Sequence, residues 1–125
     1  MPFTDSYKNT ILNAIFNNTS VGAWSPWVGL FTDIPSTAHP NGIEVSDPVY
    51  QRVPASFTVT GIIAAAPSNL IFPGSTVQWG FILGFGLFDA QTNGNLVYYD
   101  TFRDIYLVKA GAQYIIDYIN IQFNL

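Results

Sequence analysis

The stretch VQWGFILGFGLFDAQTNGNLVYYD, residues 77–100, is the longest apolar passage of the chain and the strongest indication of its fold class. Alternate residues from Val77 to Leu87 are large and apolar, and half of the residues between them are glycine. This period of two predicts a β-strand rather than a helix, because successive strand side chains point to opposite faces. Asn93-Gly94 suits the positive backbone angles of a turn. The stretch therefore predicts a hairpin.

Two features of this hairpin remain open at the level of sequence. Its thin face, with Gly80, Gly84 and Gly86, should let a second sheet or an aromatic ring approach closely. Asn93-Gly94 either closes a two-residue turn or belongs to a longer loop. That choice determines which of Tyr98 and Tyr99 joins the core.

The remainder of the chain reads as further short strands separated by turns that contain Gly, Pro and Asn. About eight strands at spacings of roughly 8–12 residues are typical of an antiparallel sandwich or barrel. We predict one all-β domain, residues 1–125, folded as an antiparallel, jelly-roll-like β-sandwich with one N-terminal amphipathic helix. Outside the hairpin, the predicted strands are Trp27–Thr32, Val49–Val53, Phe57–Ala65 with a bulge or bend at Gly61, Leu70–Phe72, Arg103–Lys109 and Gln113–Leu125.

Two segments stand outside this strand pattern. Residues 4–17 predict a helix whose apolar side chains form one stripe, and that stripe packs either as a lid on a sheet edge or open end or against a neighbouring subunit. The stripe consists of Tyr7, Ile11, Leu12, Ile15 and Phe16. Residues 33–48 form a long polar loop, which is either a protruding contact loop or a crossover between two sheets.

The composition points to a surface covered by partners. Hydrophobic residues make up 49% of the chain and charged residues only 10%, against about 25% charged in an ordinary soluble domain. A small monomer with so few charges would expose much apolar surface, so we expect a homo-oligomer. The net charge is −4, and the four Lys and Arg residues form no cluster. Nucleic-acid binding is therefore not expected.

The chain contains no cysteine, which excludes disulfides and thiolate metal sites. Its N-terminus lacks the basic and apolar regions of a signal peptide. The longest apolar run, Val77–Phe88, is shorter than the roughly 20 residues of a transmembrane helix. We therefore expect synthesis in the cytoplasm and no membrane partner.

No constellation of catalytic residues is evident. His39 is the one histidine, and no nucleophile-elbow pattern accompanies any serine. Gly84 and Gly86 begin a GxG, but Asp89 stands where GxGxxG requires glycine. The acidic residues of loops and turns match no calcium-loop spacing. We expect a protein that is not an enzyme, with no catalytic residue, cofactor or metal, whose exposed aromatic rings serve subunit contacts or a carbohydrate platform.

Taken in order, several segments make the chain resemble a family of small virion proteins of tailed bacteriophages, often labelled tail-fibre proteins. No single motif is diagnostic, and the resemblance rests on the ordered set. The segments are LNAIF (12–16), WVGLFT (27–32), EVSDPVYQRVPASFT (44–58), IFPGSTVQWGFILGFGLFDAQTNGNLVYYD (71–100) and VKAGAQYI (108–115).

The resemblance implies a non-enzymatic structural protein of the virion built on a β-sandwich. A fibre shaft would show sequence repeats, and this chain shows none. We therefore expect a capsid decoration (cement) protein that stabilises the shell as an oligomer, with a trimer as the implied state. Its partners would be the major capsid protein or other virion proteins. The alternative is a tail or tail-fibre component that acts as a receptor- or carbohydrate-binding module.

Overall fold

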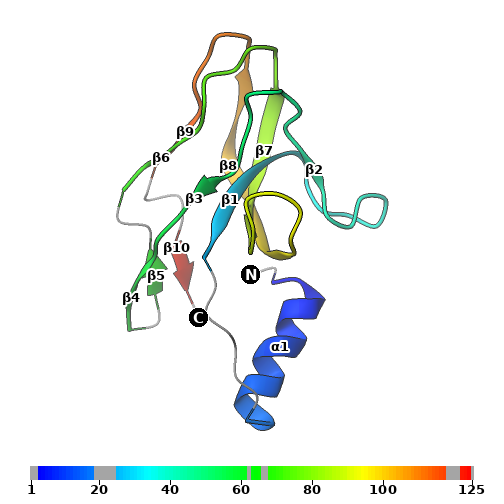
Figure 1. Ribbon diagram of the computed structural model, residues 1–125, viewed down its shortest axis with the longest axis vertical. Coiled ribbons are helices and arrows are strands. Elements are labelled where there is room, and N and C mark those ends of the chain that lie inside the picture. The colour runs from blue at the N-terminus through cyan, green and yellow to red at the C-terminus, as the bar shows by residue number, and fades with distance from the viewer. Residues whose placement is uncertain (1–2, 19–24, 62, 66–67, 118–121, 125) are drawn as a thin grey trace.

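The computed structural model of the chain describes residues 3–18, 25–61, 63–65, 68–117 and 122–124. In these ranges it has one helix, α1 (Asp5–Phe16), and short strands that all pair antiparallel (Figure 1). The predicted all-β, sandwich-like class is confirmed. In chain order the strands are β1 (Trp27–Asp33), β2 (Ile43–Glu44), β3 (Val53–Pro54), β4 (Thr58–Thr60), β5 (Ile63–Ala65), β6 (Leu70–Ile71), β7 (Gly80–Phe88), β8 (Leu96–Val108), β9 (Ile115–Ile116) and β10 (Gln122–Asn124).

The main sheet has the strand order β2-β1-β7-β8, and β3 also pairs with β1. Facing it is the two-stranded pair of β6 and β9, while β4, β5 and β10 form a third, small sheet. The principal core lies between the main sheet and the β6–β9 pair, where Leu30 and Phe85 from one side meet Leu70 and Ile116 from the other. Burial of these apolar side chains is the main source of stability, at about 25 cal/mol for each Å² removed from water.

The predicted hairpin is present as β7 and β8, and its connection is the longer of the two alternatives. Residues 89–95 form the loop, which the backbone N–H of Asp89 closes by donating to the Asn95 carbonyl at 3.2 Å. Asn93 and Gly94 both have positive φ, at 56° and 69°, within this loop. In the resulting register Tyr98 is buried in the principal core, and Tyr99 packs against a second cluster.

The strict alternation predicted for β7 is wrong near its start. Phe81 is 52% exposed, whereas Ile82 is fully buried. The reason is a jump in register, because Ile82 pairs with Tyr106 while Gly84 pairs with Thr101. Four residues of β8 thus stand opposite one residue of β7, and this bulge changes which side of the strand faces the core.

The thin face of β7 is covered by an aromatic ring at Gly86, as predicted. A Cβ atom on Gly86 would lie 2.7 Å from Cζ of Phe31 and 2.8 Å from the Phe88 ring. Gly84 is instead held against the β8 backbone at Asp100. A Cβ on Gly80 would meet nothing within 4 Å, so the face is open there. The covered part forms the second apolar cluster, which contains Phe31, Phe88 and Leu96 with Trp27 and Tyr99 at its margin.

The predicted strand Val49–Val53 is wrong, because only Val53 and Pro54 pair with β1. Residues 45–52 instead form a connection from which Tyr50 reaches the edge of β1. The Tyr50 hydroxyl accepts from the Leu30 N–H at 2.9 Å and donates to Glu44 Oε2 at 2.7 Å. This hydroxyl satisfies an edge amide between β2 and β3 that would otherwise lack a strand partner.

Two further strand predictions are corrected. The segment Phe57–Ala65 is a hairpin of β4 and β5, because Gly61 has φ of 61° and reverses the chain rather than bending one strand. Within its described residues, the segment Gln113–Leu125 contains two separate strands, β9 and β10. Asp117 breaks the apolar alternation of this segment, which predicts a bulge near it, but this position adjoins residues 118–121, which lie outside the described ranges.

Candidate functional site

The helix α1 is attached to the body only near its beginning. Phe3 pairs with Tyr98 in an isolated bridge, and the backbone N–H of Thr4 donates to the Val97 carbonyl at 3.0 Å. The Thr4 hydroxyl donates to the Leu96 carbonyl at 2.8 Å and makes no capping bond to the helix that it precedes. Phe3 also stacks on Tyr7 with ring centroids 5.9 Å apart. These contacts fix the start of the helix on the edge of β8.

Beyond this attachment the apolar stripe of the helix is exposed. Leu12 is 54%, Ile15 67% and Phe16 75% exposed, and no residue of the helix is buried. Figure 1 shows the helix extending away from the sheets. The lid on a sheet edge is therefore wrong, and the stripe remains available to a neighbouring subunit.

The 33–48 segment protrudes from the β2 edge of the main sheet (Figure 1). Part of it returns along β1 as β2, and its tip carries the exposed residues 36–41. His39 Nε2 lies 4.0 Å from Asp33 Oδ2, and the Ser36 hydroxyl accepts from the His39 backbone N–H at 3.2 Å. These contacts hold a turn together. Because the Ser36 hydroxyl bonds the backbone of His39 and not its imidazole, the described residues here do not form a catalytic triad.

The most buried charges hold the hairpin loop in place. The guanidinium of Arg52, a buried residue, pairs with Glu44 at 2.6 Å and donates to the carbonyls of Ala90 and Asn93 at 2.8 and 2.7 Å. It also lies 3.5 Å from the centroid of the Phe88 ring. Because every part of this guanidinium already has a protein partner, the group serves the fold.

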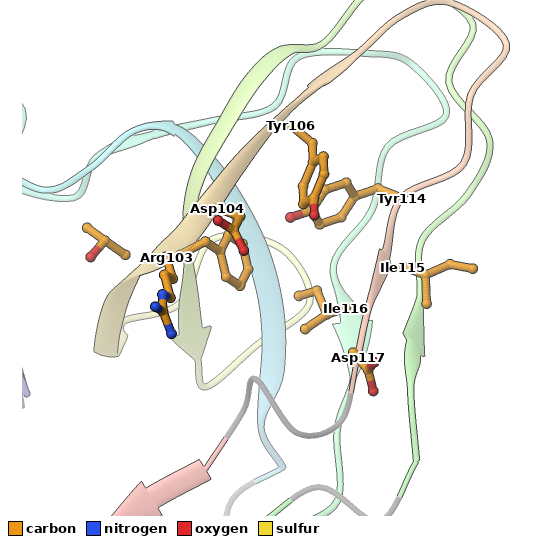
Figure 2. Close-up of a pocket in the computed structure, with 9 residues that line it drawn as sticks. Arg103, Asp104, Tyr106, Tyr114, Ile115, Ile116 and Asp117 are labelled. Atoms are coloured by element: carbon orange, nitrogen blue, oxygen red, sulfur yellow. The ribbon is translucent and has the colours of Figure 1, made fainter.

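A cavity of about 690 Å³ lies between β8 and the segment that ends in β9 (Figure 2). It lies at the bulge of β8, where the four residues 102–105 stand opposite one residue of β7. Phe102 and Ile116 form its apolar floor, and Phe102 packs on Phe85 and Tyr114 with centroids 5.5 and 6.2 Å apart. Figure 2 shows Tyr106 and Tyr114 pointing toward one another across the cavity, while Ile115 points away.

Several polar side chains at this cavity have no protein partner among the described residues. Within the described ranges, the side chains of Arg103, Asp104, Tyr106 and Asp117 make no hydrogen bond or ion pair. Tyr114 is only 9% exposed, yet its hydroxyl likewise has no hydrogen-bond partner among the described residues. No buried side-chain polar atom in the described ranges lacks a hydrogen-bond partner, so the Tyr114 hydroxyl itself opens to the cavity, where a solvent or ligand molecule can meet it.

The Tyr114 hydroxyl remains protonated over the physiological range. Burial, with a smaller contribution from the nearby Tyr106, raises the pKa of Tyr114 to about 12. The group therefore acts as a neutral donor and acceptor at the cavity wall.

Sequence reasoning assigned none of these cavity residues to a binding site. A usable signal was the Arg103-Asp104 pair, which interrupts an apolar strand in a chain with only 10% charged residues. The bulge that hollows the sheet beside the pair has no such signal, because a register jump depends on both strands.

The described residues offer no metal site, since no three His, Asp or Glu side chains among them come together to hold an ion. None of the helices in that part of the chain has the length and apolarity needed to cross a bilayer.

A protein-family model described as "Podophage GP4 fiber I protein gp80" matches residues 2–124, which is nearly the whole chain. A search of curated proteins gave no match.

Proposed function

Because the chain belongs to the family of the podophage GP4 fiber I protein gp80, we propose that it is a non-enzymatic structural subunit of a phage fibre. That the chain is a structural component of a phage particle follows from the family itself. The finer assignment to a fibre rests on the description of that family. It replaces the capsid decoration role, our first expectation from sequence, as the better supported of the two.

The subunit assembles with copies of itself through α1. An isolated helix of 12 residues is marginal in water, because most helical stability in proteins comes from packing one apolar face. The exposed stripe of Leu12, Ile15 and Phe16 has no such packing within the described part of the chain. A copy of the same stripe is its natural complement, since the only charged side chains of the helix, Asp5 and Lys8, lie in its first turns. We expect a trimer, the state implied by the resemblance noted above.

The other exposed surfaces leave room for further virion proteins. The tip of the 33–48 loop projects from the opposite edge of the main sheet to the one that holds α1, because β2 and β8 are its two outer strands. A subunit joined to its copies at one edge therefore presents this loop to different neighbours at the other.

The experiment that tests the fibre assignment is electron microscopy of intact particles labelled with an antibody against the purified chain. Label confined to the fibres is the expected result. Label spread over the whole shell would return the protein to capsid decoration, and the fibre assignment would then be wrong.

A further inference from the structure

We propose that the cavity between β8 and β9 is a saccharide-binding site. This site would give the fibre subunit a ligand, and it rests on the proposed function only for its biological setting. The geometry and chemistry of the cavity walls support it.

The cavity has the size and rigidity of a small-ligand site. Its volume of about 690 Å³ falls within the roughly 300–1,000 Å³ of such sites. Phe102 and Tyr114 are fixed by ring packing that continues through Phe85 to the buried Tyr98. A ligand would therefore meet a preformed apolar floor and would not have to order it.

The chemistry of the walls fits a sugar ring. One face of a pyranose consists of C–H groups, which pack well on aromatic rings such as Tyr106 and Tyr114. Its hydroxyls can donate to the carboxylates of Asp104 and Asp117 and accept from Arg103, and such charge-assisted hydrogen bonds are the stronger kind. The Tyr114 hydroxyl supplies a further contact, and its ring is held in place by packing on Phe102.

The charges argue against the other common small ligands. Two carboxylates and one guanidinium line the cavity, so a phosphate or other anion would face net repulsion. The lining also carries too many polar side chains for a purely apolar ligand. A neutral molecule with many hydroxyls satisfies both signs of charge at once.

The test is a titration of the purified full-length chain with glucose, galactose, mannose, N-acetylglucosamine and rhamnose, followed by fluorine NMR of 3-fluorotyrosine incorporated at the tyrosines. For at least one of these sugars we expect saturable shifts of the Tyr106 and Tyr114 signals with a Kd of about 1 mM. The signal of Tyr50, which lies outside the cavity, should stay in place. Exchange of Tyr106 for alanine should weaken binding about tenfold or more, read at Tyr114.

Phe81→Ala is the matched control. Phe81 is an aromatic residue of similar exposure, and its side chain faces away from the cavity because its strand partner is Leu107 and not Tyr106. This variant should bind within about twofold of the original chain.

The absence of a saturable shift with every sugar would overturn the proposal, as would binding that Tyr106→Ala leaves unchanged. Signals of Tyr106 and Tyr114 that respond to protein concentration and not to sugar would assign the cavity to a contact between copies. Each of these outcomes is independent of where the chain sits in the particle, so failure here is separate from failure of the fibre assignment.

Discussion

Gly86 shows at the level of a single residue why the central hairpin is rich in glycine. The Phe31 ring lies over Gly86 where a side chain would otherwise stand, and the Phe88 ring fills the space beside it. This packing lets the outer face of the main sheet bury aromatic surface without a complete second layer above it. The glycine is thus a packing requirement and has no connection with phosphate binding.

We predict that Gly86→Ala destabilises the protein by about 1–3 kcal/mol, because the added methyl group overpacks this cluster. The measurement is the urea midpoint at fixed protein concentration. Gly74→Ala is the control, since a Cβ there would meet only a carbonyl oxygen at 3.9 Å. Equal midpoints for the two variants would show that the Phe31 ring moves aside freely.

Asp47 shows how one side chain joins two elements. Its carboxylate accepts from the Thr76 N–H at 2.8 Å, the Thr76 hydroxyl at 2.6 Å and the Trp79 indole N–H at 2.8 Å. Desolvation alone would raise the pKa of Asp47, but these hydrogen bonds prevail and hold it well below its usual range. The end of the long loop is thereby tied to the chain that enters β7.

This depressed pKa predicts a pH dependence of stability. Since the folded-state pKa lies below the unfolded value of about 3.9, the carboxylate stabilises the fold above about pH 4 and loses this effect as the pH falls further. We expect Asp47→Asn to lower the urea midpoint at pH 7 and to converge with the wild type at low pH. The control is Asp104→Asn, which removes a carboxylate that accepts no hydrogen bond from the described residues and should leave the urea midpoint at pH 7 unchanged. Parallel slopes for Asp47→Asn and the wild type would contradict this.

At the scale of elements, α1 has no buried residue, and under the proposed function a neighbouring copy covers its apolar stripe. Its start is fixed by Phe3 and Thr4, while its last turns carry Ile15 and Phe16 into solvent. At 1.5 Å per residue the helix extends about 18 Å, so its far end lies well away from the attachment on β8.

We predict that the double variant Ile15→Gln, Phe16→Gln dissociates the oligomer or raises its dissociation constant by at least about tenfold. Sedimentation velocity at micromolar concentration measures this. Val59→Gln is the matched control, because Val59 is 70% exposed on β4 and lies outside the helix. A monomeric wild-type chain, or a variant with unchanged mass, would exclude α1 as the subunit contact.

The elements also show how far sequence alone could lead. The helix and the hairpin were predictable, because each follows from a strong local period in apolar residues. The role of Tyr50 was not predictable, because its segment alternates like a strand. In the structure its hydroxyl, and not a strand, bonds the edge of β1. The cavity escaped prediction for a related reason, as the bulge of β8 is defined only by its pairing with β7.

For the whole molecule, the structure shows where the few charged side chains lie. Most of the charged side chains in the described ranges are used internally, as in the pairs Arg52–Glu44 and Lys8–Asp5 and in the hydrogen bonds of Asp47 and Asp89. Four charged side chains in these ranges have no partner, and three of them, Arg103, Asp104 and Asp117, gather at the cavity, while Lys109 lies outside it. A subunit with an apolar helix at one place and a polar cavity at another is suited to assemble by the first and to bind by the second.

The central claim is that the chain is a fibre subunit joined to its copies through α1. Its most direct test is a reconstruction of the intact phage particle by electron cryomicroscopy. We predict that this β-rich body occupies fibre density, with Leu12, Ile15 and Phe16 of each copy packed against the helices of its neighbours. Density for the chain on the capsid shell, or fibre subunits whose helices stand alone in solvent, would contradict it.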